Sequence, residues 1–331
     1  MRGPLVTAAV ISYNAEKTIS RALSSIFAQT YKNIEVILVD SGPGDTTKKI
    51  VTSHFPEVKY IFQEKSGAPA AANEAVQQAK GEFVAFLHAD DEWLPHKTEL
   101  QMQVLQRHPG ISVLQCGFWV VKETYKNENV DVKLVGKQEV ELKEITFREW
   151  FTRRAFCWTG SVPSGWLFKR SFFLEQGGFA LDSAPGEDWE FLLRITGRGY
   201  TVATMSLPLF KYYEYTASAS HSTSGVLKGA KIIPQIMSRY DPRGEGGEAD
   251  WLSVEEYELA IQKEYFHRAW ILLRNGNSEE RSLAQKYLQE AIALAQKYNR
   301  RDLWRWRIAS WCPELYIKLH CIKNIFSTYK K

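Results

Sequence analysis

The sequence has few cysteines and lacks several motifs that would place it in a common class. Its four cysteines form no C-x-x-C pair and no zinc-like pattern with histidine, which argues against a zinc site or a disulfide scaffold. No G-x-G-x-x-G follows the first predicted strand and no G-K-[ST] occurs, so dinucleotide-binding and P-loop proteins lose their main support. No apolar run approaches the roughly 18 residues of a membrane-spanning helix. Reduced thiols are typical of a cytoplasmic protein, which is the location we expect.

An excess of charge of one sign is also absent, except at the C-terminal end. The net charge of the 331 residues is +4, which is too small to indicate a nucleic-acid coat. Residues 299–331 hold eight basic and two acidic residues, so they carry +6 and residues 1–298 sum to −2. Aromatic side chains interleave with these charges, among them Trp304, Trp306, Trp311, Tyr316 and Phe326. A basic aromatic helix can lie on an anionic membrane surface, which for this protein would be the inner face of the membrane. Alternatively, its aromatic rings can pack onto the rest of the protein.

Short apolar segments of strand length alternate with helical segments over the first 120 residues. The predicted strands are 5–12, 34–39, 58–62, 82–87 and 112–121. The predicted helices are one capped by Asn14, one after the loop 41–45, and those at 69–80 and 95–107. This alternation predicts an α/β fold with a mostly parallel central sheet. Ligands of such sheets bind beyond the carboxyl ends of the strands.

The later part of the chain is less regular. We expect a surface excursion or hairpin over 122–144, a strand at 165–169, short helices at 171–176 and 187–197, and extended chain over 200–213. The composition of residues 241–250 predicts a linker. Helices at 254–274 and 278–298 then form a hairpin. We therefore predict a domain over 1–240, with a nucleotide-binding half at about 1–120 and an acceptor half at about 121–240, and a helical extension with a basic, Trp-rich tail over 251–331.

Two acidic pairs stand where the predicted fold would put a site. Asp90 and Asp91 follow a strand at the carboxyl edge of the sheet, where Asp40 also ends a strand. Carboxylate oxygens suit a hard divalent cation that bridges phosphates, although the pair could also only open a loop and cap the next helix. Glu187 and Asp188 begin a helix, where acidic residues are common. Such a pair could equally serve as a base that takes a proton from a hydroxyl.

Several motifs together resemble a family 2 glycosyltransferase of the GT-A fold over about residues 4 to 220. They are AVISYN at 9–14, QTYKNIEVILVD at 29–40, ANEA at 72–75, GEFVAFLHADD at 81–91, and GGF at 177–179 followed by GEDWEF at 186–191. Each motif alone is weak, but the five share the order and spacing of the family. The resemblance implies a GT-A nucleotide-binding domain that carries the C-terminal helical extension.

The resemblance also implies roles for particular residues. Asp188 would be the catalytic base, with Glu187 assisting at the acceptor. The nucleotide sugar would be bound by Ser12, Tyr13, Asn14, Asp40, Asn73, His88 and Asp90. Mg²⁺ or Mn²⁺ would be bound by Asp90, Asp91 and His221.

The chain departs from the family pattern at several positions. His88 stands where the family has an acidic residue, Ser41 replaces a second aspartate, and Ala72 replaces an arginine. Tyr215 aligns with a late histidine of the family, which nearby His221 could replace; a surface position for His221 is equally open. These departures affect the identity of the donor more than the fold.

The resemblance implies an inverting transfer of a sugar, with a UDP- or dTDP-linked hexose as donor. The acceptor would be a hydroxyl of a glycan or lipid-linked sugar in surface polysaccharide synthesis, and no nucleic-acid partner is expected. Two alternatives remain open from the residues. One is a sugar-nucleotide-binding or scaffold protein that has lost catalysis, for which His88, Ser41 and Ala72 speak. The other is a nucleotidyltransferase, which would need a basic glycine-rich early loop that residues 12–14 do not offer.

Overall fold

The computed structural model describes seven stretches of the chain. They are residues 3–64, 67–122, 131–135, 141–152, 161–215, 222–240 and 252–298. His221, the predicted linker 241–250 and the tail 299–331 lie outside the described residues. The domain limits expected from the sequence therefore stay a prediction.

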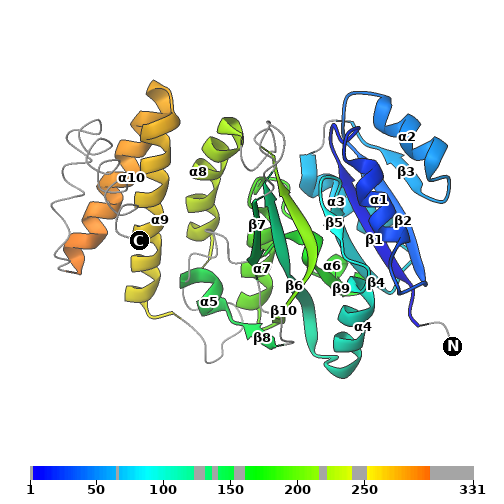
Figure 1. Ribbon diagram of the computed structural model, residues 1–331. Helices are drawn as coiled ribbons and strands as arrows, with labels where there is room; N and C mark the ends of the chain where they lie inside the picture. The colour runs from blue at the N-terminus through cyan, green and yellow to red at the C-terminus, as the bar shows by residue number, and fades with distance from the viewer. Residues whose placement is uncertain are drawn as a thin grey trace.

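A ten-stranded sheet forms the centre of the molecule (Figure 1). Its strand order is β3 (Lys59–Phe62), β2 (Ile34–Asp40), β1 (Val6–Ser12), β4 (Phe83–His88), β9 (Leu167–Lys169), β6 (Ile111–Lys122), β10 (Thr201–Glu214) and β5 (Glu92–Trp93). Two further strands, β7 (Asp131–Val135) and β8 (Leu142–Ile145), pair with β6 and β10. β1, β2, β3, β4, β6 and β10 run in one direction, so the expected mostly parallel sheet is confirmed.

Helices cover both faces of this sheet. One face carries α1 (Ile19–Phe27), α2 (Thr46–His54) and α4 (Lys97–Arg107). The other carries α3 (Gly67–Gln78), α5 (Phe147–Thr152), α6 (Arg170–Glu175) and α7 (Glu187–Gly197). The side chains of β1 alternate between the two cores, and all seven of its residues are buried. A strand that is buried on both faces is mainly apolar, and the two polar residues of β1, Thr7 and Ser12, form side-chain hydrogen bonds to Glu35 and Asp40.

The C-terminal helices form a layer at one end of the molecule. α9 (Val254–Asn275) and α10 (Ser278–Lys297) pack against each other, and α9 also packs on α8 (Thr223–Ser238) (Figure 1). Ser253 with Glu256 and Asn277 with Glu280 form capping boxes that satisfy backbone N–H groups at the helix starts. The predicted helical hairpin is confirmed, whereas α8 was not anticipated from the sequence.

Local structure differs from the expectation just after β1. Asn14 does not cap a helix: α1 begins at Ile19, with Thr18 at the cap position. Asn14 instead has a φ of 50°, a left-handed conformation that asparagine tolerates better than most residues. Its backbone lies against Gly42, where an added Cβ would meet the Asn14 nitrogen at 2.9 Å. The tight approach of these two loops, rather than helix capping, explains both residues.

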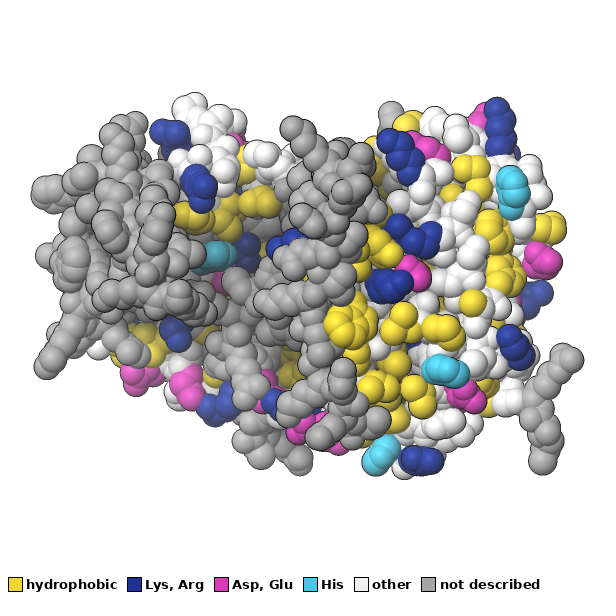
Figure 2. Space-filling model, in the orientation of Figure 1, with side chains coloured by type: hydrophobic (Ala, Val, Ile, Leu, Met, Phe, Trp, Pro, Cys, Tyr) yellow, Lys and Arg dark blue, Asp and Glu magenta, His cyan; other side chains and the backbone are white. Residues whose placement is uncertain are grey.

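The described surface and helices add two observations. No helix among the described residues is long and apolar enough to cross a membrane. On the face drawn in Figure 2, basic and acidic side chains are interspersed over the half that carries α1, α2 and α4. This distribution agrees with the near balance of charge outside the tail.

Candidate active site

The carboxyl ends of three neighbouring strands bring the first predicted residues together. Ser12 of β1 pairs with Asp40 of β2, and Ile11 of β1 pairs with His88 of β4. Neighbouring strands lie about 4.8 Å apart, so Asp40 and His88 are about 10 Å apart across the edge. The convergence expected from the strand alternation is therefore present at this edge.

Asp40 connects three segments through its carboxylate. Ser12 Oγ donates to Asp40 Oδ1 at 3.0 Å, and the hydroxyl of Tyr60 donates to Oδ2 at 2.9 Å. The N–H of Gly42 also donates to Oδ1, at 3.2 Å. Asp40 is fully buried, and burial together with this bond raises the pKa of Tyr60. Ser12 and Asp40 are thus buried at this edge, whereas 67% of the surface of the next residue along the chain, Tyr13, is exposed.

The segment from His88 to Asp91 forms a turn closed by the Asp91 N–H, which donates to the His88 carbonyl at 3.0 Å. Asp91 is fully buried. Its Oδ2 accepts from Ser164 Oγ at 2.5 Å, and its Oδ1 accepts from the Tyr213 N–H at 3.2 Å. Burial raises the pKa of Asp91 well above its usual range, and the Asp90 charge raises it further. Both oxygens of Asp91 are therefore occupied in holding the turn.

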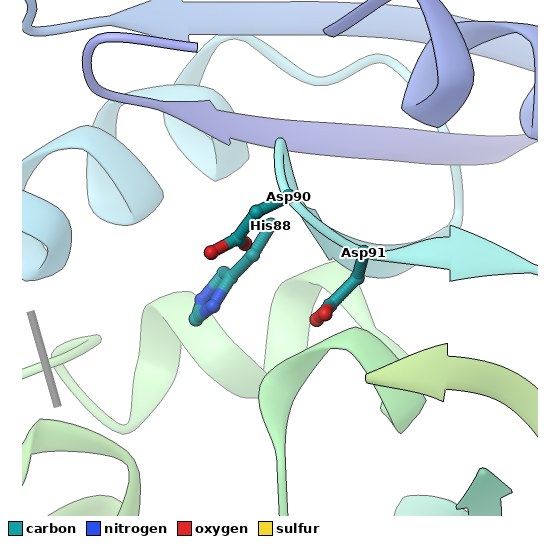
Figure 3. A group of neighbouring side chains, drawn as sticks. All are labelled: His88, Asp90 and Asp91. Carbon is teal, nitrogen blue, oxygen red and sulfur yellow. The ribbon is translucent and has the colours of Figure 1, made fainter. Parts of the chain in front are cut away.

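Asp90 and His88 differ from Asp91 because their side chains have no hydrogen-bond partner among the described residues. Figure 3 shows the imidazole of His88 and the carboxylate of Asp90 against each other, with the carboxylate of Asp91 apart from them. The potential ligand atoms of the three residues lie within 4.8 Å of one another. Ligand atoms about 2.1 Å from one cation lie roughly 3 to 3.5 Å apart, so the side chains would have to rotate to bind one ion together. These residues fit a divalent cation, with Asp90 as the accessible carboxylate.

Arg21 holds the apex of this turn from α1. One guanidinium nitrogen donates to the Asp90 carbonyl at 2.6 Å and to the Tyr215 hydroxyl at 2.8 Å. The guanidinium also lies over the ring of Tyr213, 3.6 Å from its centroid. The hydroxyl of Tyr213 donates to Glu92 at 2.8 Å. The sequence did not single out Arg21 or Ser164, because their partners lie far away along the chain.

The second acidic pair begins α7 and is partly buried. Burial raises the pKa of Glu187 to about 7, with a further contribution from the charge of Asp188. Burial also raises the pKa of Asp188 to about 6. The mutual repulsion expected from the sequence is thus present for Glu187, but removal from water is the larger cause for both.

An aromatic cluster connects α7 with the strand that carries the metal turn. The ring of Phe179 lies 5.5 Å from Phe86 of β4 and 5.6 Å from Phe191 of α7, measured between centroids. Phe86 precedes His88 by two residues, and Phe191 follows Asp188 by one helical turn. Packing through Phe179 therefore ties the two acidic pairs to one rigid core.

Asn73 has a structural partner that its motif did not reveal. Its Nδ2 donates to the Phe179 carbonyl at 2.9 Å, and its Oδ1 accepts from the Phe179 N–H at 2.8 Å. Gly178 has a φ of 66°, and an added Cβ would lie 2.6 Å from Asn73 Oδ1. The side-chain amide of Asn73 thus fixes the Gly177–Phe179 segment, and nucleotide binding by Asn73 stays a prediction.

Comparison with known proteins places the chain in a family. The sequence model described as glycosyl transferase family 2 matches residues 7–174, slightly more than half of the chain. The chain belongs to this family.

An uncharacterised glycosyltransferase of Rickettsia typhi is 31% identical over 144 residues, which are 40% of this chain and 45% of that protein. An Escherichia coli UDP-Glc:alpha-D-GlcNAc-diphosphoundecaprenol beta-1,3-glucosyltransferase, WfgD, is 32% identical over 43% of this chain and 54% of its own length. The chain thus spans about half the length of these relatives.

Solved structures of low sequence identity share the fold. S. aureus TarS in complex with UDP is 16% identical, with a TM-score of 0.61 over 92% of this chain and 88% of that chain. The mannosyltransferase PcManGT from Pyrobaculum calidifontis, in complex with GDP-Man and Mn²⁺, is 18% identical, with a TM-score of 0.52 over 98% of this chain and 88% of its own. These likenesses establish a GT-A fold for this family 2 glycosyltransferase.

Proposed function

We propose that this glycosyltransferase moves a hexose, with inversion, from a UDP- or dTDP-sugar to a hydroxyl of a lipid-linked sugar or growing glycan. The observation that supports this most is the accessible Asp90 carboxylate beside His88, at the sheet edge that also carries Asp40. The similarity to WfgD, a glucosyltransferase that acts on a diphosphoundecaprenol-linked sugar, favours an acceptor of this kind. We place the reaction in surface polysaccharide synthesis at the cytoplasmic side of the membrane.

The nucleotide would lie over the ends of β1 and β2. Ser12 and Asp40 are buried and hydrogen-bonded to each other, so they would form a rigid surface beneath the nucleotide. The exposed ring of Tyr13 offers a face on which a base can stack. Asn14 is held beside Gly42 with its side chain at the surface.

Asp90 and His88 would hold a divalent cation, Mg²⁺ or Mn²⁺, next to the diphosphate of the donor. Such a cation, when bound, neutralises part of the negative charge on the departing nucleoside diphosphate. Asp91 supports the turn from beneath, because both of its oxygens already accept hydrogen bonds. His221, the other expected ligand, lies outside the described residues.

Asp188 would act as the base. Its carboxylate takes the proton from the acceptor hydroxyl while that oxygen forms a bond to the anomeric carbon of the donor. The bond from the anomeric carbon to the diphosphate oxygen breaks on the opposite face, and its electron pair leaves with the diphosphate. A pKa of about 6 leaves Asp188 ionised but still basic at neutral pH. Glu187, adjacent in the chain, would bind the acceptor.

The test is a panel of nucleotide sugars offered with a diphosphoundecaprenol-linked sugar and Mn²⁺. Release of nucleoside diphosphate with formation of a longer glycan is expected for one or a few donors. Asp90→Asn should abolish turnover, whereas Asp182→Asn, which removes an exposed carboxylate paired with Arg239, should not. Release of pyrophosphate would indicate a nucleotidyltransferase. Tight donor binding without any product, across acceptors, would indicate a binding protein.

A further inference from the structure

Ser164 bridges the two ends of the turn that presents Asp90. Its hydroxyl oxygen accepts from the His88 N–H at 3.0 Å and donates to Asp91 Oδ2 at 2.5 Å. Ser164 is fully buried, in the short helical turn Pro163–Gly165. One hydroxyl therefore joins the first and last residues of the turn, and Asp90 lies between them.

The turn that carries Ser164 is itself held by buried polar groups. The indole of Trp93 donates to the Ser164 carbonyl at 2.9 Å, and Gln101 Nε2 donates to the Gly165 carbonyl at 2.8 Å. Behind them Lys97 is fully buried, donates to Gln101 Oε1 at 2.8 Å, and lies 4.2 Å from the centre of the Trp93 ring. These contacts leave the Ser164 hydroxyl little freedom to move.

We propose that Ser164 is a positioning residue that sets the Asp90 carboxylate for cation binding, an inference that rests on the proposed function. Arg21 fixes the Asp90 carbonyl from the other side, at 2.6 Å. With both ends and the apex of the turn held, the carboxylate of Asp90 faces His88 without reorganisation. Outer residues that orient metal ligands typically change metal affinity by about 10- to 100-fold when they are removed.

The Ser164 bridge joins parts of the chain that lie far apart in the sequence. Ser164 lies more than 70 positions after His88 and Asp91, in the part of the chain expected to form the acceptor half. The Ser164 hydroxyl therefore connects the expected acceptor half to the turn after β4. A purely structural hydroxyl would stabilise the fold without altering the affinity for a cation.

The experiment measures Mn²⁺ affinity of the full chain by titration, with free Mn²⁺ followed by electron paramagnetic resonance, in the presence of UDP. Ser164→Ala removes the bridge, and Ser164→Cys keeps a weak hydrogen-bonding group in a slightly larger side chain. Thr196→Val is the matched control, because it removes a buried hydroxyl whose hydrogen bonds within the described part of the chain go to carbonyls of α7. Urea unfolding of each variant reports stability separately from affinity.

We expect Ser164→Ala to weaken Mn²⁺ binding about tenfold or more, Ser164→Cys to fall between it and wild type, and Thr196→Val to match wild type. In an Asp91→Ala background, which removes the carboxylate that the Ser164 hydroxyl holds, the effect of Ser164→Ala should shrink to less than about threefold. A folded Ser164→Ala protein with unchanged affinity overturns the inference and leaves the proposed function standing. If Ser164→Ala does not fold, Ser164→Cys decides in the same way. A wild-type protein that binds UDP but no Mn²⁺ overturns both the inference and the cation in the proposed function.

Discussion

Asp188→Asn should have opposite effects on turnover and on stability. The side chain is partly buried at the start of α7, and burial raises its pKa to about 6 from an ordinary value of 3.8. The fold therefore favours the protonated acid, whereas the proposed reaction needs the carboxylate. An amide of nearly the same shape removes the base and also removes the cost of burying a charge.

The effect on turnover follows from the loss of the base. Replacing a general base typically lowers the rate about 10²- to 10⁴-fold, and binding of the donor should change little because Asp188 would face the acceptor. In the wild type, the ionised fraction of a group with a pKa of about 6 is roughly one tenth at pH 5. The wild-type rate should therefore rise about tenfold between pH 5 and its plateau near pH 7.5.

The effect on stability has the other sign. Because the pKa is higher in the folded than in the unfolded chain, the stabilisation from protonated Asp188 is present below about pH 4 and is lost as the pH rises through about 6. Each pKa unit corresponds to about 1.4 kcal/mol. After allowance for partial exposure, Asp188→Asn should raise the free energy of unfolding at pH 8 by about 2 kcal/mol and leave it nearly unchanged at pH 4.

Urea unfolding at pH 4 and pH 8, together with nucleoside diphosphate release between pH 5 and 8, tests both effects. Asp182→Asn serves as control, since that carboxylate is exposed and paired with Arg239. A wild-type rate that stays flat from pH 5 to 8, or an Asn variant less stable at pH 8, would refute the assignment of Asp188 as a buried base.

Three further predictions concern the cation, the Asn73 contact and the tail. Chelation should abolish transfer, and Mn²⁺ should restore activity better than Mg²⁺ because an imidazole suits Mn²⁺ more than Mg²⁺. His88→Asp should reduce this preference for Mn²⁺. An equal response of the wild type to both ions would contradict the prediction. Asn73→Ala should lower the free energy of unfolding by about 2 kcal/mol in urea titrations, since two hydrogen bonds to Phe179 are lost; an unchanged midpoint would show that water replaces them. A chain that ends at Tyr298 should float less with anionic liposomes than the full chain if the basic tail contacts membranes, and equal recovery in the soluble fraction would end that idea.

The architecture could be predicted from the sequence to a large extent. Strands such as 5–12 and 82–87 are short, apolar and followed by helical periodicity, and this pattern has few structural solutions. The expected strands and helices of the first 120 residues are present in the expected order, with the two-residue strand β5 (Glu92–Trp93) as an unexpected addition, and the hairpin of α9 and α10 is confirmed. α8 was missed, although Ser222 caps it through the Gly225 N–H, because that signal is local and weak.

The location of the candidate site could be predicted from the sequence, but the role of each residue in it could not. Asp40 ends β2 and Asp90 follows the end of β4, and these strands run in the same direction, so the meeting of the two residues at one edge follows from the alternation of elements. The adjacent residues Asp90 and Asp91 look equivalent in the sequence, yet one carboxylate is accessible and the other is buried in hydrogen bonds. Similarly, Asn73 could have faced a nucleotide, but it holds the backbone of Phe179.

The sequence by itself determined the sheet, the edge at which polar residues gather and the presence of two acidic pairs, because hydrophobic periodicity and chain direction are local properties. Only the tertiary structure decided which carboxylate is free, which residues hold it and how far burial shifts the pKa of Asp188. Those outcomes depend on partners such as Ser164 and Arg21, which are about 70 positions away from the turn that they hold and meet it only after the chain has folded.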